Sequence, residues 1–402
     1  MNNINKQLSQ EGLNIEILKD FESIENKRTI WEIMQQNESL PTPDADINRY
    51  IACAKAFSDN MQPSVMFIEQ NDRPKAIIVG HIQKHEIKLN IGYKTLLSPK
   101  LKCLSIAYGG ILGQPDDDFC SILVDKIKKQ LRTHKISMAF FNHLRSDTPF
   151  YQAVRKIPCI CTRGHCPKID EHWRMSVPDH IDKFYSARSR GHRHNLRKTI
   201  RTFEKDYSPE NNLINYTEEK EVDEFIKIAA EISTKTYQRA LGAGIKNDEQ
   251  TKCLLKEAAK NGWFRGHILF ANDKPCAFQN ALHYNNVYYM VSIGYDPAFS
   301  HYKPGIILFL KVLETICADP SINMLDFYFG DAEYKHRYGT EHWPEACAYI
   351  FAPGLYPIFI NMLLSSTLYL NEGLRYAANS IGVVNWVKRK WRNLLRDKSA
   401  KS

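Results

Sequence analysis

The sequence predicts an α/β protein with mixed sheets, arranged as two consecutive domains. The chain has 402 residues, which is more than an ordinary single core requires. Between Asn286 and Tyr338 a strand, a loop, a helix and a second strand follow one another without a tight hairpin turn. This order is typical of two parallel strands joined by a crossover helix. A similar order of elements occurs earlier, between Ser64 and Arg155.

Composition and charge limit the class of protein. Apolar residues make up 43% of the chain and charged residues 25%, which is ordinary for a soluble globular protein. The net charge of +9 is concentrated in Ser186–Lys205 and Trp386–Ser402, each with a net charge of +6. The polar start at Met1–Lys6 lacks the apolar core of a signal peptide, and ten scattered cysteines do not resemble a disulfide scaffold. We therefore expect reduced cysteines and a cytoplasmic location.

The most informative region combines two strands with a buried helix. Its segments are the strand Val287–Tyr295, the loop Asp296–Lys303, the helix Pro304–Ala318 and the strand Met324–Phe329. Pro304 suits the first helical position because its φ is fixed and it has no N–H group. Gly305 allows close approach to the backbone. We expect the free N–H groups of Ile306 and Ile307 to form an anion site at the helix start, supported by the helix dipole.

The remaining elements follow from hydrophobic periodicity and turn residues. The first half is predicted to contain strands at Leu13–Leu18, Ser64–Glu69, Lys75–Lys84, Ile87–Tyr93, Leu104–Gly109 and Ile136–Phe141, and helices at Glu22–Gln36, Asp46–Phe57, Cys120–Thr133 and Thr148–Arg155. The second half is predicted to contain helices at Asp182–Phe203, Lys220–Arg239 and Asn247–Asn261, and strands at Gly266–Ala271 and Cys276–His283. The glycines of Tyr108–Gly113 either cradle an anion or serve as turn residues in a half without ligand.

Three motifs in the second half carry a family resemblance. They are Tyr295-Asp-Pro-Ala-Phe299, Tyr302-Lys-Pro-Gly305 and Asp326-Phe-Tyr-Phe-Gly-Asp-Ala-Glu-Tyr-Lys-His-Arg337. Together they resemble the CelD-like branch of the GNAT acyltransferases, which is associated with exopolysaccharide and cellulose biosynthesis. The resemblance implies two tandem GNAT-like halves and an acyl-CoA co-substrate such as acetyl-CoA. The chain departs from the usual GNAT phosphate loop, of which only Gly305 is present.

The resemblance also implies a division of the chain and the place of the donor. We expect a degenerate GNAT-like domain at residues 1–165, a GNAT-like domain with the acyl-CoA site at 166–352, and C-terminal helices with a basic, aromatic tail at 353–402. The donor is expected between the two parallel strands, where backbone N–H groups polarise the thioester carbonyl. The expected donor-binding residues are Tyr295, Lys303, Gly305, Ile306, Ile307 and Lys335.

Catalytic residues are expected directly after the second parallel strand. Asp331 and Glu333 are candidate bases for the attacking amine, and Tyr334 is a candidate to protonate the departing thiolate. Asp331 has an alternative as the N-cap of a short helix. Lys335 and Arg337 have an alternative as charged residues of an exterior turn.

The acceptor is expected to meet a second set of polar residues. This set comprises Arg188, Arg190, Arg193, Tyr237, Arg239, Gln279 and Arg337. The arginines suit bidentate contacts with oxyanions, but a solvated helix face paired with Glu218, Glu219 and Glu221 explains them equally well. Tyr237 and Arg239 also fit the frayed end of a helix. Gln279 also fits a hydrogen-bonded core group.

Three further segments have competing interpretations. Cys159–Cys166 lacks the spacing of a zinc site, and a strand with buried cysteines is preferred, so no metal is expected. Ala346–Asn371 has no charged residue, but Pro353, Gly354 and Pro357 favour a strand followed by a buried or surface-lying helix over a membrane span. The tail Asn385–Arg396 mixes aromatic and basic residues, which suits either an anionic membrane surface or a docked helix.

The sequence therefore predicts an N-acyltransferase that moves an acyl group from CoA to an amine by direct attack, with no permanently bound cofactor. The predicted acceptor is an amino sugar, a nucleotide-linked sugar or another small amine. The alternatives are an aminoacyl-tRNA-dependent transferase of the peptidoglycan cross-bridge type and a non-catalytic protein with the same fold. The tRNA alternative is weakened because the long helical hairpin of many such enzymes is not predicted here.

Overall fold

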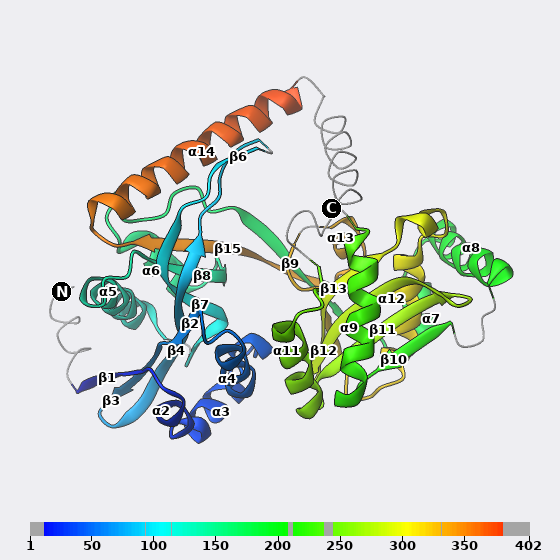
Figure 1. Cartoon of the computed structure of the whole chain (residues 1–402), viewed down its shortest axis with the longest axis horizontal. Helices are drawn as coiled ribbons and strands as arrows, with labels where there is room; N and C mark the ends of the chain where they lie inside the picture. The colour runs from blue at the N-terminus through cyan, green and yellow to red at the C-terminus, as the bar shows by residue number, and fades with distance from the viewer. Residues whose placement is uncertain are drawn as a thin grey trace. The chain divides into compact units, whose positions relative to one another are not determined.

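The computed structural model describes residues 12–92, 94–113, 115–207, 212–236, 244–330 and 332–380. These residues form two compact units (Figure 1). Unit 1 contains the chain up to Glu171 and again from Trp343, and unit 2 contains His172–His342. This division differs from the predicted boundaries, since Trp343–Phe351 belongs to unit 1.

The sheet of unit 1 has the strand order β1-β3-β4-β7-β8-β15, with β2 paired to β4. The strands are β1 (Leu13–Leu18), β2 (Met61–Pro63), β3 (Val65–Gln70), β4 (Arg73–Glu86), β7 (Lys100–Leu112), β8 (Met138–Arg145) and β15 (Glu341–Phe351). A separate pair is formed by β5 (Leu89–Ile91) and β6 (Lys94–Leu97). In the main sheet β7 and β8 run parallel, while β8 and β15 are antiparallel. The chain thus returns after unit 2 to complete the sheet of unit 1.

The helices of unit 1 cover both faces of its sheet. They are α2 (Phe21–Glu25), α3 (Arg28–Gln36), α4 (Ile47–Ala56), α5 (Asp117–Thr133), α6 (Pro149–Lys156) and α14 (Leu355–Ser380), with the short η1 (Pro43–Ala45). Helix α5 crosses from β7 to β8 and begins where Asp116 accepts a hydrogen bond from the Phe119 amide at 2.9 Å. Its predicted apolar side is buried, since Leu123 and Ile127 are fully inaccessible.

The sheet of unit 2 has the strand order β9-β14-β13-β12-β11-β10. The strands are β9 (Ile169–Ser176), β10 (Leu213–Tyr216), β11 (Phe264–Ala271), β12 (Lys274–Tyr284), β13 (Val287–Tyr295) and β14 (Met324–Asp326). Strands β13 and β14 are parallel and are joined through α12 (Pro304–Cys317), as predicted. The other neighbouring strands are antiparallel, so the sheet is mixed.

The helices of unit 2 pack on two sides of this sheet. The remaining helical segments are α7 (Ile181–Ser186), α8 (Arg190–Asp206), η2 (Glu219–Glu221), α9 (Val222–Thr234), α11 (Glu249–Lys260), η3 (Pro297–Tyr302) and α13 (Glu333–Tyr338). One core contains α12 with side chains of α7, α8 and α13, and another contains α9 and α11. Most of α12 is buried, as its nearly continuous apolar sequence predicts.

Several predicted elements differ from the structure. The helix predicted at Asp182–Phe203 is two helices, because the Ser189 side chain accepts from the His192 amide at 3.3 Å and starts α8 anew. Strand β14 ends at Asp326 rather than Phe329. The preferred strand at Cys159–Cys166 is wrong, because Cys159 and Cys161 lie exposed in turns. Among the described residues no group of three His, Cys, Asp or Glu side chains is arranged to hold a metal ion.

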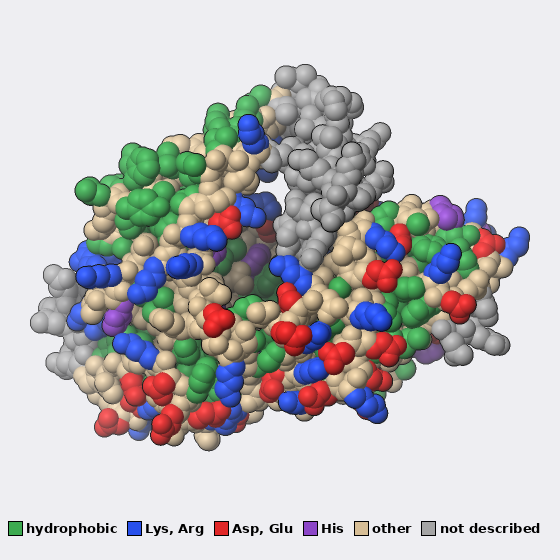
Figure 2. Space-filling model, in the orientation of Figure 1, with side chains coloured by type: hydrophobic (Ala, Val, Ile, Leu, Met, Phe, Trp, Pro, Cys, Tyr) green, Lys and Arg blue, Asp and Glu red, His purple; other side chains and the backbone are tan. Residues whose placement is uncertain are grey.

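Helix α14 follows β15, as predicted for this uncharged segment. Ile360 and Leu364 pack into unit 1, while another face of the helix exposes large apolar side chains. Figure 2 shows hydrophobic side chains gathered along this helix. None of the helices formed by the described residues has the length and apolarity that crossing a membrane requires.

Candidate functional site

The two parallel strands of unit 2 diverge at a β-bulge. Strand β14 pairs only with the first three residues of β13, ending at the pair Tyr289 and Asp326. In the next stretch of β13, Met290 and Val291 together face the single residue Ala281 of β12. A bulge bends the strand that carries the extra residue. The rest of β13, up to Tyr295, therefore leaves β14 and has an edge without a β14 partner.

The start of α12 lies at the end of β13. The expectation of free amides at Ile306 and Ile307 is wrong, because both donate to the Lys303 carbonyl, at 2.9 and 3.3 Å. Lys303 makes this possible by taking a left-handed conformation, with φ of 57°. Gly305 is half-buried, and a Cβ atom there would lie 3.5 Å from the Tyr295 ring. Among the expected donor-binding residues at the start of α12, Gly305 has a backbone amide with no acceptor among the described residues.

A buried ionic network holds the end of β14. The Asp326 carboxylate is fully buried and accepts from Arg174 Nε at 2.6 Å and from the Tyr328 amide at 2.7 Å. His172 Nε2 lies 2.9 Å from Asp326 Oδ1, the oxygen that also accepts from the Tyr328 amide. Burial by itself would raise the pKa of Asp326, but His172 and Arg174 outweigh it and lower that pKa. The network fixes the turn that leads from β14 towards α13.

Lys335 supports the same turn from its other side. Its ammonium donates to the carbonyls of Tyr328 at 2.9 Å and Phe329 at 2.7 Å, and the residue is buried. The structure therefore contradicts the expectation that Lys335 holds acidic groups of the donor. Tyr328, held between Asp326 and Lys335, has a left-handed φ of 55°. Strained non-glycine residues of this kind persist only where the surroundings hold them firmly.

Two of the predicted catalytic residues, Glu333 and Tyr334, lie on α13. Glu333 is exposed and forms an ion pair with Arg337 one turn later. Tyr334 is partly buried, with its ring edge-on to Phe327 at 5.7 Å between centroids. Asp331 lies outside the described residues.

The end of α13 meets the start of α8 around a histidine. His192 Nε2 lies 3.4 Å from the Tyr338 hydroxyl. Burial, Arg337 and Arg188 all lower the pKa of His192, so its ring is neutral at neutral pH. The Arg188 guanidinium lies over the rings of Phe184, at 4.5 Å, and Tyr338, at 5.5 Å, and burial lowers its pKa. Its buried Nε has no acceptor among the described residues.

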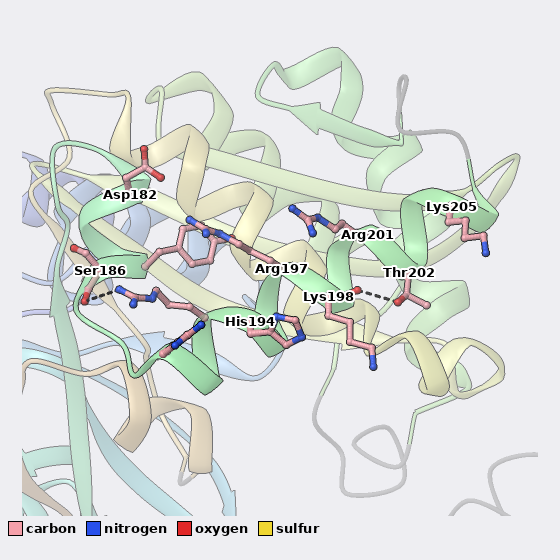
Figure 3. A pocket seen from close by; sticks show the side chains of 11 residues that line it. Asp182, Ser186, His194, Arg197, Lys198, Arg201, Thr202 and Lys205 are labelled. Atoms are coloured by element: carbon pink, nitrogen blue, oxygen red, sulfur yellow. Dashed lines mark hydrogen bonds between the residues drawn. The ribbon is translucent and has the colours of Figure 1, made fainter.

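A basic groove of about 910 Å³ follows α7 and α8. It is lined by Asp182, Tyr185, Ser186, Arg190, Arg193, His194, Arg197, Lys198, Arg201, Thr202 and Lys205. Figure 3 shows Arg197, Lys198 and Arg201 projecting from α8. The groove contains the predicted acceptor residues Arg190 and Arg193, and extends the basic surface along the helix.

The acidic residues named in the alternative interpretation of these charges have other partners in the structure. Glu218 pairs with Lys220, Glu219 pairs with Lys260, and Glu221 accepts from backbone amides. Among the described residues, no ion pair involves Arg190, Arg193, Arg197, Lys198, Arg201 or Lys205. The groove therefore presents six basic side chains that have no ion pair among the described residues, and planar guanidinium groups are well suited to phosphate and carboxylate.

Other predicted acceptor residues are placed differently. Gln279 is 1% exposed and donates to the Tyr288 hydroxyl at 3.0 Å, a contact that fits the alternative of a core group. His267 lies 2.7 Å from the same hydroxyl, and burial lowers the pKa of His267 to about 3. Tyr237 and Arg239 lie outside the described residues.

The glycines of unit 1 are explained by packing. A Cβ atom at Gly109 would lie 2.6 Å from Thr42 Oγ1, and one at Gly113 would lie 2.4 Å from the Lys75 carbonyl. Both have positive φ. Gly109 lies within β7 and Gly113 directly follows that strand, and close packing accounts for glycine at both positions.

The sequence analysis missed the network of His172, Arg174 and Asp326. A signal was present, because His172 and Arg174 share one face of β9 by alternation and Asp326 interrupts an apolar strand. Their partnership could not be read from the sequence, since more than 150 residues separate them.

Comparison with known protein families gives a match within unit 2. Residues 190–336 match the model of the acetyltransferase (GNAT) domain family. No curated protein matches the chain in sequence.

Solved structures match most of the chain in fold. FemX superposes with a TM-score of 0.55 at 8% identity, covering 86% of this chain and 100% of FemX. A conserved protein of unknown function from Bacteroides thetaiotaomicron VPI-5482 superposes with a TM-score of 0.51 at 10% identity, covering 84% and 100%. A tandem GNAT protein from the clavulanic acid biosynthesis pathway gives 0.49 at 9% identity, covering 85% and 99%.

At these identities the superpositions with FemX and the Bacteroides protein show the fold alone, and they confirm the predicted mixed α/β class. The family match confirms the GNAT part of the resemblance. Residues 190–336 are an acetyltransferase (GNAT) domain, and the protein is an acyltransferase.

Proposed function

We propose that the protein is an N-acyltransferase of the CelD-like branch that takes an acyl group, acetyl in the first instance, from CoA. The observation that carries this proposal is the divergence of β13 from β14 at the bulge, within a GNAT domain. The freed edge of β13 offers backbone groups along which an extended thioester arm can pair, as an added strand does. The start of α12 at Gly305 then adjoins the far end of that edge.

The chemistry follows from this placement. The acceptor amine attacks the thioester carbonyl, a base takes the amine proton, and the CoA thiolate leaves. A backbone N–H of β13 polarises the carbonyl. Such a hydrogen bond stabilises the developing negative charge more where water is excluded than in bulk water. Asp331 and Glu333 are the proposed bases, with Tyr334 as proton donor to the thiolate.

We assign the basic groove to the acceptor. Six cationic side chains of α8 without an ion pair among the described residues suit a ligand with two or more phosphates, such as a nucleotide-linked amino sugar. We also assign Arg188, whose buried Nε has no acceptor among the described residues, to an acidic group of the acceptor near α13.

Donor binding tests the proposal directly. Acetyl-CoA at about 100 times its Kd should add about 2.7 kcal/mol to the stability of the native state. Gly305→Glu should abolish the rise in melting temperature, because it places a carboxylate at the helix start. The backbone tolerates a side chain there, since φ is not positive and the nearest atom is 3.5 Å away. A wild-type protein that no acyl-CoA stabilises would contradict the proposal.

The same stability measurement distinguishes acyl-CoA from aminoacyl-tRNA as the donor. Stabilisation by aminoacyl-tRNA and not by acyl-CoA would favour the peptidoglycan cross-bridge type of transfer. A protein stabilised by neither would favour a non-catalytic role for the fold.

We also propose peripheral contact with an anionic membrane through α14 and the tail that follows it. Leu355, Phe359 and Met362 lie one turn apart on α14 and are each more than half exposed. The tail continues with basic and aromatic residues in its sequence. Apolar side chains beside lysine and arginine are typical of segments that lie in a membrane interface. An acceptor carried on a lipid would be compatible with this location.

A further inference from the structure

Unit 1 repeats the strand arrangement of the candidate site in unit 2. Strands β7 and β8 are parallel, are joined through α5, and pair only from Cys103 with Met138 to Ile106 with Phe141. Beyond Ile106, β7 has a large bulge, since Val79 of β4 faces Ala107–Gly110. The two strands therefore diverge in unit 1 in the same way as β13 and β14 do in unit 2.

A cysteine and a histidine face each other beside this divergence. In the ladder between β8 and β15, Asn142 and His143 together face the single residue Cys347. His143 takes a left-handed φ of 50° at this bulge. Cys347 is therefore opposite His143 across the ladder. Bulges and strained residues of this kind are over-represented next to active sites because they direct a side chain away from the regular ladder.

A buried carboxylate lies on the other side of the histidine. Glu345 precedes Cys347 by two residues on β15, so both side chains project from the same face. Glu345 Oε2 lies 3.6 Å from His143 Nδ1. Its other oxygen accepts from the Tyr108 hydroxyl at 2.9 Å and from Trp343 Nε1 at 2.6 Å. These two donors fix the carboxylate, which is 1% exposed.

The charges of the three groups are coupled. Burial alone would lower the pKa of His143, but the thiol of Cys347 and the carboxylate of Glu345 raise it to about 9. The ring is thus an imidazolium at neutral pH.

The arrangement also reaches solvent. The His143 side chain is 20% exposed, and Cys347 is half-buried. A purely structural ion pair would be expected to bury the histidine together with Glu345. Instead the carboxylate is enclosed, while the histidine and Cys347 are both partly exposed.

We propose that Cys347, His143 and Glu345 form a second reactive site, in which the Cys347 thiolate accepts an acyl group from a thioester. Cys347 is the nucleophile, His143 carries the proton, and Glu345 orients the histidine. Activated nucleophiles commonly use such a series of three groups. The sulfur of Cys347 attacks the carbonyl carbon, the new C–S bond forms and the thioester C–S bond breaks. The departing thiolate takes the proton held by His143. The choice of a thioester as donor follows from the proposed function of unit 2.

The test uses a small thioester that carries no phosphate and therefore does not depend on α8 or α12. Full-length protein is incubated with S-acetyl-N-acetylcysteamine, and acetylation of each cysteine is followed by peptide mass spectrometry. We expect an adduct on Cys347 that hydroxylamine removes. It should form at least about tenfold faster than on Cys253, which is exposed on α11 and has no such neighbours.

Variants separate the roles. His143→Asn keeps a side chain that tolerates the left-handed conformation but removes the imidazole, and should slow acetylation of Cys347 about a hundredfold while leaving Cys253 unchanged. Cys347→Ser should remove the adduct at this position and keep the melting temperature. Cys347 reacting no faster than Cys253, or at the same rate in His143→Asn, would overturn the proposal.

The outcome is independent of donor binding in unit 2. The same reaction in Gly305→Glu should acetylate Cys347 at the wild-type rate. If acyl-CoA fails to stabilise the protein while Cys347 is still acetylated, the function proposed for unit 2 is wrong and the second site stands. If acyl-CoA binds but Cys347 does not react, the second site is wrong.

Discussion

At the scale of single residues, the structure separates buried charged groups that hold the turn after β14 from charged groups that are exposed to solvent. Asp326 and Lys335 belong to the motif Asp326–Arg337, and both are buried and form hydrogen bonds with the turn at residues 328–329. Glu333 and Arg337, from the same segment, are exposed and pair only across one helical turn. Burial and partner, rather than residue type, distinguish the two classes.

We predict that Asp326→Asn destabilises the protein by about 3–5 kcal/mol, because it leaves the buried Arg174 charge without its carboxylate. Urea unfolding at neutral pH measures this change. Glu333→Gln is the matched control, since an exposed pair of this kind contributes about 0–1 kcal/mol. Equal effects of the two substitutions would show that the network is not important for stability.

We predict that the contribution of the Asp326 carboxylate to the free energy of unfolding is lost at acidic pH. The pKa of Asp326 in the folded protein lies below its ordinary value of 3.8, so folding favours the ionised form. Its contribution is present at pH values above 3.8 and is lost as the pH falls through the folded pKa. The stability difference between wild type and Asp326→Asn should therefore shrink between pH 5 and pH 3. A difference that stays constant over this range would contradict the assignment of the charge to Asp326.

At the scale of elements, two helices carry surfaces that their packing does not use. Helix α8 buries Leu196 and Phe203 against unit 2 and presents its basic residues to the groove. Helix α14 buries one face in unit 1 and exposes an apolar one. Each surface predicts a different kind of partner, a polyanion in the first case and a lipid interface in the second.

For α8 we predict that combining Arg193→Gln, Arg197→Gln and Arg201→Gln weakens binding of a nucleoside diphosphate more than tenfold, while the free energy of unfolding changes little. Each charge-assisted contact is worth about 1.5–3 kcal/mol, and tenfold corresponds to about 1.4 kcal/mol. Isothermal titration at two salt concentrations measures the affinity and its screening. Lys227→Gln on α9, an exposed lysine outside the groove, is the control for loss of charge alone.

For α14 we predict binding to vesicles that contain anionic lipid, measured by co-sedimentation. Combining Leu355→Ser, Phe359→Ser and Met362→Ser should abolish binding without lowering the melting temperature, because these side chains are exposed. Ile360→Ser is the contrasting variant, since Ile360 is 4% exposed and should destabilise unit 1. Retention of vesicle binding by the triple variant would exclude the α14 surface.

At the scale of the whole molecule, unit 1 is built from two separate parts of the chain. Strand β15 pairs with β8, and its Ala346, Ala348 and Ile350 belong to the core that contains α5. Unit 2 is inserted between these parts. The folding of unit 1 therefore depends on residues that follow unit 2.

We predict that a fragment of residues 1–165, the first domain expected from the sequence, does not fold. It would lack β15 and leave the edge of β8 and its apolar face exposed, a condition that favours aggregation. Joining residues 1–171 to 343–384 by a short flexible linker should restore a soluble fold with a cooperative thermal transition. A folded 1–165 fragment in circular dichroism would contradict this account.

The sequence by itself determined the elements whose signals are local. The bounds of β1 and β13 are as predicted, and the helix predicted at Asp46–Phe57 begins where Asp46 accepts from the Asn48 amide. Periodicity and capping act within a few residues, so they can be read from the chain. The GNAT domain could also be identified, because its motifs fall within about 50 consecutive positions of the sequence, between Val287 and Arg337.

Only the tertiary structure decided which polar residues meet. It placed Lys335 and Gln279 in the interior, and gave β15 to unit 1. It also brought His143 to Cys347 from a distance of more than 200 positions in the chain. The physical reason is that the state of a charged or nucleophilic group depends on burial and on neighbours from distant strands, and no local pattern of residues specifies either.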